Sequence, residues 1–317
     1  MSAGSCYGGT MRNYVIRRLL LLILVLWGVT LVTFILMHVV PGDPAKVLLG
    51  KLSGNEVLVA KLQHQLGLDK PLVVQYFEFV KGILHGNLGN SYKFKASVMS
   101  LILERMPATI KLTFGALIIG LLIGLSSGII SAVRRYSIWD TFSMLFAFIG
   151  VSMPVFWLAM LLQLLFAVKL GWFHVSGFEG LRDLVLPSVT LGLIYSASIA
   201  RMTRSSILEV IRMDYVRTAR AKGAPERIVF SRHVFRNALI PIVTMIGMQF
   251  GGLLTGAALT ETVFQIPGVG KLLINSTLDL DYPMIQGGVM FVAIVFVLVN
   301  LLVDVLYAYL DPTIRYD

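Results

Sequence analysis

The polar chemistry of this sequence is concentrated in one stretch, from Glu209 to Pro241, here called the cassette. It holds seven Lys and Arg residues and three acids, and long apolar runs lie on both sides of it. Paired carboxylates and Ser/His arrangements, the usual signs of acid–base or nucleophilic catalysis, do not stand out anywhere in the sequence, so no enzyme activity is expected. A basic, helically patterned stretch between apolar runs favours a docking element for a soluble partner. The alternative is a solvated loop that only follows the charge rule of membrane topology.

Two short helices joined by a turn are predicted within the cassette. The first covers about Ile207 to Lys222 and ends at Gly223, because glycine readily adopts the left-handed conformation that terminates helices. Pro225 and the acidic residue after it suit the first turn of the second helix, which runs towards Asn237. The candidate coupling residues are Arg217, Ala219, Arg220, Lys222, Gly223, Ala224, Pro225 and Glu226.

The composition indicates a polytopic membrane protein. Of 317 residues, 56% are hydrophobic and 14% are charged, and the mean hydropathy is +0.81. A soluble domain is about 45–50% apolar and about 25% charged. The single cysteine, Cys6, excludes an internal disulfide and a cysteine metal cluster, and the five histidines lie far apart, so no cofactor is expected.

Six apolar segments divide the chain. Residues 14–40 form an uncleaved first membrane helix after a flexible N-terminal extension, residues 1–13. Residues 41–108 are amphipathic and predict a small extracytoplasmic subdomain of three or four helices, the last at 98–106. Residues 109–310 form a five-helix core that contains the cassette (209–241), and residues 311–317 form a cytoplasmic tail. Each core segment is near the ~20 residues that span a bilayer, at about 109–133, 141–168, 186–208, 239–260 and 284–310.

The basic residues set the orientation. With the N-terminus in the cytoplasm, the inner segments hold 15 Lys and Arg residues, and the short outer segments hold four. The other eight lie in the long segment 41–108, which the rule discounts. The count places both termini and the cassette in the cytoplasm. It also accounts for the net charge of +10 without a nucleic-acid partner.

Two of the predicted membrane helices carry glycines at four-residue spacing, which allows close approach between helices. In the second helix Ala116, Gly120, Gly124 and Gly128 favour ordinary packing. The fifth helix, directly after the cassette, has candidate packing and gating residues at Gly247, Gly251, Gly252 and Gly256.

Ionisable residues near the membrane segments give a weaker signal. Arg201 and Arg204 lie at the inner end of the fourth helix and Asp304 near that of the sixth. They favour an interhelical pair or side chains that reach the surface over a proton relay. Gly268-Val269-Gly270-Lys271 is not a P-loop, because Gln265 stands where the first glycine is required and Leu272 replaces Ser/Thr.

Several segments carry a family resemblance in their order and spacing. The cassette resembles the coupling loop of binding-protein-dependent ABC importers, Glu-Ala-Ala, three residues, then Gly. Ala219 and Gly223 match the last Ala and the Gly, while Arg217 and Thr218 replace the Glu and the first Ala. Over nearly its whole length the chain resembles the B-type permease subunit of oligopeptide and dipeptide importers. The segments are YVIRRLLLL at Tyr14, PGDPA at Pro41, LGLDKPL at Leu66, ERMPAT at Glu104, DYVRTARAKG at Asp214, RNALIP at Arg236, ETVFQIPGVGKLL at Glu261 and NLLVDVLYAYLDPTIRY at Asn300.

This resemblance implies an all-α permease of six transmembrane helices with the type I ABC importer fold, in a bacterial or archaeal cytoplasmic membrane. The implied partners are a homologous second permease subunit, two cytoplasmic ATPase subunits, an extracytoplasmic binding protein and the lipid bilayer. The implied substrate is a di- or oligopeptide. Relatives that carry nickel or glutathione remain alternatives, as does, in a different class, a secondary transporter acting alone.

Overall fold

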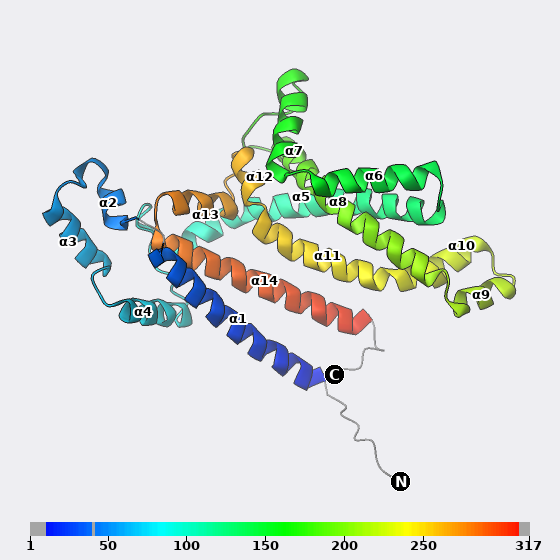
Figure 1. Cartoon of the computed structure of the whole chain (residues 1–317), viewed down its shortest axis with the longest axis horizontal. Helices are drawn as coiled ribbons and strands as arrows, with labels where there is room; N and C mark the ends of the chain where they lie inside the picture. The colour runs from blue at the N-terminus through cyan, green and yellow to red at the C-terminus, as the bar shows by residue number, and fades with distance from the viewer. Residues whose placement is uncertain (1–10, 40–41, 311–317) are drawn as a thin grey trace, which may run out of the picture. The chain divides into compact units, whose positions relative to one another are not determined.

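The computed structural model describes residues 11–39 and 42–310, and over these residues the chain is all-α. The first ten residues of the predicted flexible extension and the predicted tail, 311–317, lie outside the described residues. Five helices are long and apolar enough to cross a membrane, and a sixth candidate is a bent pair of helices. The elements, drawn in Figure 1, are α1 (Met11–Val39), α2 (Pro44–Leu49), η1 (Gly50–Leu52), α3 (Glu56–Leu66), α4 (Leu72–Leu84), α5 (Val98–Val133), α6 (Ile138–Ser152), α7 (Val155–Leu162), η2 (Gln163–Lys169), α8 (Leu181–Val210), α9 (Asp214–Ala221), α10 (Glu226–Ile228), η3 (Val229–Phe235), α11 (Arg236–Gly256), α12 (Ala258–Val263), α13 (Val269–Leu278) and α14 (Tyr282–Leu310).

The chain forms two compact units. Among the described residues, unit 1 comprises those up to residue 108 together with 267–297, and unit 2 comprises 109–266 and the residues from 298 onward. Both α5 and α14 contribute to each unit. The separate helix predicted for residues 98–106 is wrong, because α5 continues from Val98 through Pro107 to Val133. A proline removes one backbone hydrogen bond and disfavours a helix interior, which is why the sequence indicated a boundary there.

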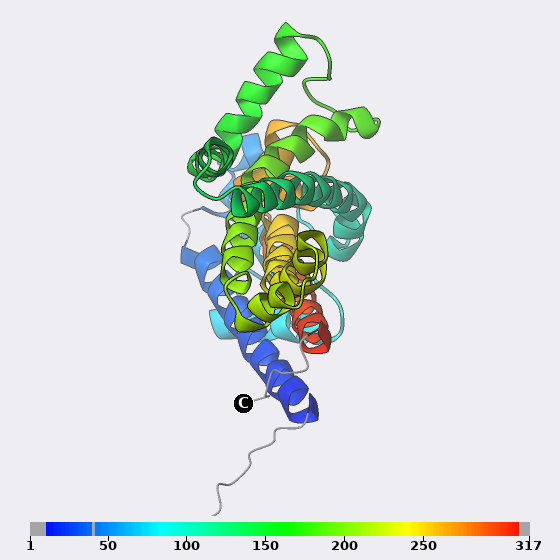
Figure 2. The same cartoon turned by 90° about the vertical axis from the view of Figure 1, so that its right-hand side faces the viewer.

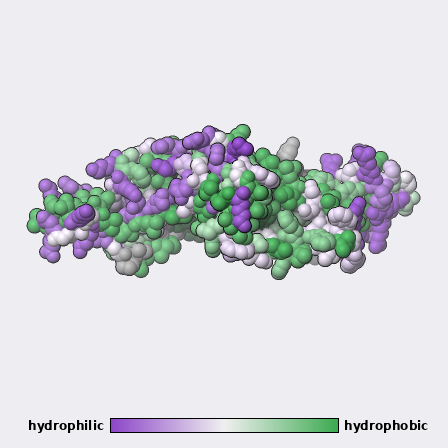
Figure 3. Space-filling view, turned by 90° about the horizontal axis from the view of Figure 1, so that it is seen from above, coloured by the Kyte–Doolittle hydropathy of each residue, from purple (hydrophilic) through white to green (hydrophobic). Residues whose placement is uncertain are grey.

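Short helices with clear end signals fill the first part of unit 1. The Asn55 side chain accepts a hydrogen bond from the backbone amide of Leu58 at the start of α3, and Gly67, with φ of 70°, ends that helix. Pro71 stands before the first residue of α4. The periodicity of the sequence predicts helices from Asn55 to Leu66 and from Leu72 to Leu84, within a residue of the observed bounds. In Figure 3 the α2–α3 end presents hydrophilic and hydrophobic residues side by side.

A buried carboxylate joins two distant segments of unit 1. Asp281, just before α14, accepts hydrogen bonds from the Ser91 hydroxyl at 2.5 Å and from the backbone amides of Tyr92 and Lys93 at 3.0 and 3.3 Å. The Lys93 ammonium lies 2.5 Å from the carboxylate of Asp279. Burial, with a smaller contribution from the charge of Asp281, raises the pKa of Tyr92 to about 12. These contacts fix the loop before α5 to the start of α14.

Helix α8 is the centre of unit 2, where it packs against α6, α7 and α11. It also meets α5 along a seam of small residues, because side-chain atoms at Gly120, Gly124 and Gly128 would approach the backbone of α8. The apolar cluster beneath the cassette includes Ile207 from α8, Ala132 from α5 and Ile242 from α11. In unit 2, α5 and α8 therefore pack so closely that their backbones lie next to each other.

Pro154, inside the third predicted span, predicts a kink because proline removes a backbone hydrogen bond. The structure has a full break there instead. The two halves of the span, Ile138–Gly150 and Val155–Lys169, meet at 104°. Met153 is extended, as expected before a proline, and Pro154 then precedes α7. In Figures 1 and 2, α7 rises steeply away from α6.

Candidate functional site

The cassette has the predicted helix–turn–helix form, with two corrections. Helix α8 ends at Val210, and the first cassette helix begins only at Asp214, not near Ile207. The intervening backbone forms tight turns, in which the amides of Arg212 and Met213 donate hydrogen bonds to the carbonyls of Glu209 and Val210, respectively. The helix is therefore interrupted at residues 211–213, between α8 and the first cassette helix.

The second cassette helix does not stop near Asn237. It begins at Glu226 and continues through η3, a π-helical turn, into α11, so that residues Glu226–Leu253 form one membrane-span candidate. Pro241 lies inside α11 without ending it. The chain after the turn is thus continuous with the fifth membrane helix. The sequence reasoning missed this because the polar residues Ser231, Arg232 and His233 resemble the end of a helix.

The turn itself is formed as the residue types predict. Gly223 has φ of +78°, in the left-handed region, and its amide donates to the carbonyl of Arg220 at 2.9 Å. The amide of Ala224 donates to the carbonyl of Ala219 at 3.3 Å. Pro225 is extended and caps α10, which begins at Glu226. The reversal therefore depends on Gly223 and Pro225 at adjacent ends of the two helices.

One face of the cassette is apolar and packs on the membrane helices. Val216, Val229 and Val234 are fully buried in the cluster under the cassette, and Ala219 and Ala224 pack against it while half-buried. Ala224 is therefore partly covered by its own chain, and only part of its surface is open to a partner. In Figure 3 the α9–α10 end carries a concentration of hydrophilic residues, and Figure 2 looks onto that end.

The basic side chains lie on the exposed face, as the periodicity predicts, but two of them already have acidic neighbours. Arg220 contacts Glu226 across the turn with N–O distances of 2.5 and 3.3 Å, and Arg217 lies 3.6 Å from Asp214. The hydrogen bond to Glu226 raises the pKa of Arg220 above its ordinary value. Lys222 is exposed. The pair of Arg220 and Glu226 connects the two cassette helices across the turn.

The candidate glycines of α11 lie in different surroundings. A side chain at Gly247 would collide with Val303 of α14, whereas for one at Gly252 the nearest atom of the described residues is the Tyr195 hydroxyl, at 3.9 Å. Gly251 is buried. Gly256 is the last residue of α11, and its surroundings fall outside the described part of the chain. The four glycines therefore do not form one uniform ridge.

The arginines at the inner end of α8 take separate roles. Arg204 forms an interhelical pair with Asp140 of α6, with N–O distances of 2.9 and 3.0 Å, and Ser131 of α5 donates to the same carboxylate. Arg201 is exposed, and the side chain of Asp304 lies outside the described residues. An interhelical pair was predicted, but its acid, Asp140, was missed. Its signal was an aspartate directly before the third predicted span, 141–168.

A second buried carboxylate was also missed. Glu261 of α12 is fully buried and accepts a hydrogen bond from the Thr109 hydroxyl of α5 at 2.7 Å. The predicted fifth span stopped one residue before it, so its burial was not foreseen. Among the residues that the structure describes, no cluster of His, Cys, Asp and Glu could hold a metal ion.

The comparisons with known proteins define the class. The family model described as the inner membrane component of binding-protein-dependent transport systems matches residues 120–316, and the model for the N-terminal part of such components matches residues 11–113. The chain belongs to this family. It is a multi-pass permease subunit of ABC importers, in which the ATPase is a separate subunit.

Several relatives with named substrates are similar to this chain over nearly its whole length. The chain is 43% identical to the dipeptide transport system permease protein of Alkalihalophilus pseudofirmus, over 96% of this chain and 100% of the relative. It is 43% identical to the di/tripeptide transport system permease protein of Pseudomonas aeruginosa (97% and 100% covered) and 44% identical to the glutathione transport system permease protein of Salmonella paratyphi A (96% and 100% covered).

Two solved structures agree with the fold. The inward-facing MetNI methionine ABC transporter matches with a TM-score of 0.57 and 20% identity, covering 67% of this chain and 97% of that chain. An amino acid ABC transporter solved with histidines matches with a TM-score of 0.52 and 17% identity, covering 68% and 95%. At such identities the likeness establishes the permease fold alone.

Proposed function

We propose that this chain forms half of the translocation pathway for di- or oligopeptides and that its cassette docks on a cytoplasmic ATPase subunit. A homologous permease subunit would form the other half, a second ATPase would bind that subunit, and an extracytoplasmic binding protein would deliver the peptide. The peptide assignment is supported by the names of the relatives. Glutathione, which is itself a tripeptide, is the second candidate because a relative of equal identity carries it.

The observation that carries the coupling proposal is the asymmetric attachment of the cassette. The turn at Gly223, Ala224 and Pro225 leads without interruption into α11, whereas the other cassette helix is separated from α8 by a break. A displacement of the turn by a closing ATPase would therefore reach α11 directly. We propose that α11 is the helix that moves, with Gly251 and Gly252 on its adaptable part.

The orientation proposed for this function follows the distribution of basic residues, with the termini and the cassette in the cytoplasm. Cysteines introduced at exposed Lys51 and Arg217, in a background in which Cys6 is replaced by serine, test it. In intact cells a membrane-impermeant thiol reagent should modify only the Lys51→Cys variant. Modification of only the Arg217→Cys variant would show the opposite orientation, with the cassette outside the cytoplasm.

Reconstitution of the full importer tests the function. ATP hydrolysis should rise when the binding protein carries a dipeptide, and a comparison with glutathione and with a nickel salt identifies the substrate. Stimulation by nickel alone, with no response to either peptide, would contradict the proposed substrate class.

Ala224→Trp in the same complex tests coupling. The enlarged side chain should obstruct docking at the turn, so ligand-stimulated ATP hydrolysis should be lost while the complex still inserts and binds its extracytoplasmic partner. Ala60→Trp, at an exposed position of α3, is the matched control and should retain stimulation. If ligand-stimulated ATP hydrolysis in the Ala224→Trp complex is normal, the cassette is not the docking element, and the interpretation as a solvated loop remains.

A further inference from the structure

Helix α4 in unit 1 carries an apolar stripe that is largely exposed within the described chain, with only Val80 half-buried. Val73, Phe77, Val80 and Leu84 recur at helical spacing and therefore lie on one face. Val73 is 66% exposed, Phe77 is 65% exposed and Leu84 is 80% exposed. In water, such a stripe would be an exposed apolar surface of the kind that marks contact with a membrane or another protein.

The other faces of α4 are already occupied. Ile83 packs on the apolar core of unit 1, and Tyr76 contacts α1. Gln75 and Glu78, on the polar side, line a small polar cavity of about 120 Å³ together with His38 of α1. The stripe therefore faces away from the rest of unit 1, and an outside medium or partner must meet it.

The contacts of α4 with α1 place it beside the membrane span. The hydroxyls of Tyr76 and Thr30 lie 3.0 Å apart, and the ring of Tyr76 packs on that of Phe34 at 5.3 Å. Thr30 and Phe34 both lie within the apolar span of α1, Leu20–Val39. A helix whose side chain touches α1 within this span lies next to the membrane segment.

The residue before Tyr76 contacts α1 at the end of the span. Gln75 and His38 form a hydrogen bond of 3.2 Å, one residue before the end of the span at Val39. Lys81 is exposed on the polar side of the stripe, and its long apolar stem lets the ammonium reach the phosphate level. A polar side, an apolar stripe and a flanking lysine are typical of helices that lie in a membrane interface.

We propose that α4 is an interfacial membrane helix, with Val73, Phe77, Val80 and Leu84 in contact with the acyl chains of phospholipids in the leaflet at the Val39 end of α1. This narrows the expectation for residues 41–108, because α4 then lies in lipid while α2 and α3 stay in water. The inference goes beyond the proposed transport function and holds for either orientation of the chain.

Spin labels on the complete importer in phospholipid nanodiscs test the proposal. Labels are placed singly at Phe77→Cys and Leu84→Cys, with Cys6 replaced by serine. The matched controls are Val57→Cys, an exposed apolar position on α3, and Lys81→Cys on the polar side of α4. Labels at 77 and 84 should collide frequently with oxygen and rarely with a water-soluble nickel chelate, and the two controls should show the reverse.

Two outcomes overturn the proposal. If the labels at 77 and 84 meet the nickel chelate as often as the label at 57, the stripe lies in water. If they are shielded from oxygen and from the chelate, the stripe contacts a protein, such as the second permease subunit or the binding protein. Agreement between positions 77 and 84 guards against a local disturbance by either label.

Discussion

Helices α5 and α11 both carry glycines at four-residue spacing, yet the two helices use them differently. On α5, a Cβ at Gly124 would lie 2.8 Å from the Ser196 carbonyl oxygen, and one at Gly128 would lie 2.6 Å from that of Ala200. On α11, a Cβ at Gly252 would have 3.9 Å to its nearest neighbour, a tyrosine hydroxyl. The α5 glycines meet the backbone of another helix, whereas the neighbour that the described residues place beside Gly252 is the end of a side chain.

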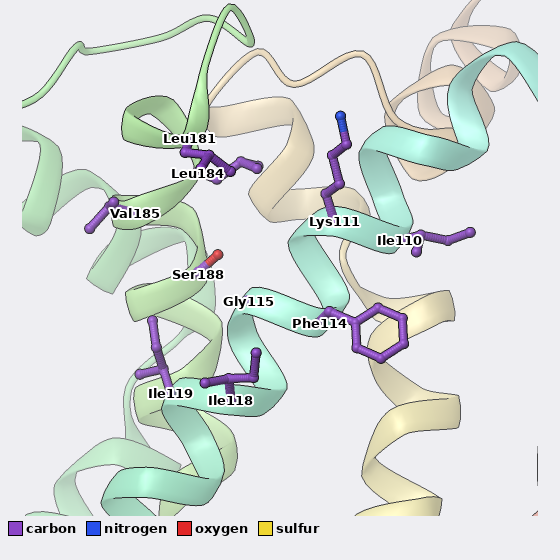
Figure 4. Close-up of a pocket in the computed structure, with 10 residues that line it drawn as sticks. All are labelled: Ile110, Lys111, Phe114, Gly115, Ile118, Ile119, Leu181, Leu184, Val185 and Ser188. Carbon is purple, nitrogen blue, oxygen red and sulfur yellow. The ribbon is translucent and has the colours of Figure 1, made fainter.

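The difference shows that the same spacing can serve fixed or adaptable contacts. At Gly124 and Gly128 the added Cβ would meet a backbone carbonyl of α8, which cannot rotate aside, so α5 and α8 hold one separation there. Figure 4 shows the neighbouring part of the α5–α8 contact, where Ser188 of α8 lies beside Gly115 of α5 in a groove with a volume of about 500 Å³. A glycine beside a flexible side chain leaves room for a helix to shift, which fits the proposed movement of α11.

The largest effect is expected for Gly124→Leu. Its Cβ alone would lie 2.7 Å from that of Ile199, and overpacking of a filled interior costs about 1–3 kcal/mol or more. Most of the folded permease should be lost, as measured by the yield and melting temperature of the purified complex. Gly28→Leu on α1, with no atom of the described residues within 4 Å of the added Cβ, is the control and should be purified in normal amount. A stable Gly124→Leu complex would mean that the seam can open.

A smaller and different effect is expected for Gly252→Leu. The complex should form in near-normal amount, but transport per assembled complex should fall several-fold because the added side chain fills the space that a shifting α11 needs. Uptake into proteoliposomes, normalised to the quantity of complex, measures this. Gly120→Leu should instead lower the quantity of complex, since its Cβ lies 3.3 Å from the Gly192 carbonyl oxygen. Equal losses of complex in both variants would leave only packing as the role of Gly252.

The smallest effect is expected for Gly252→Ala. A methyl group 3.9 Å from the Tyr195 hydroxyl is in ordinary contact, so stability should change by no more than about 0.5 kcal/mol. Thermal unfolding and uptake should both match the unmodified complex. Gly128→Ala, the counterpart on α5, should be clearly destabilised. A loss of transport in Gly252→Ala would show that α11 is packed more tightly than this structure records.

The sequence predicted the local features of this fold better than its long-range partners. The apolar segments and the turn at Gly223 follow from residue type and spacing over a few positions, and the structure has both. At Pro154 residue type predicted a kink, and the structure has a break. The pairing of Arg204 with Asp140 and the burial of Glu261 and Asp281 depend on segments 64 to 190 positions apart in the chain. Nothing in local spacing specifies such partners. The continuity of α10 with α11 was missed for another reason: a π-helical turn keeps the backbone bonded across residues that look like a helix end.

The π-helical segment Val229–Phe235 also sets the direction in which the cassette points around the axis of α11. A π turn holds about one residue more than an α turn, and such turns often mark functional positions. Because each α-helical residue advances the chain by about 100°, removing one residue here would rotate α10 and the turn at Gly223 about the axis of α11 without altering a single residue of either. The direction in which the cassette presents itself is therefore set by the length of a single helical turn.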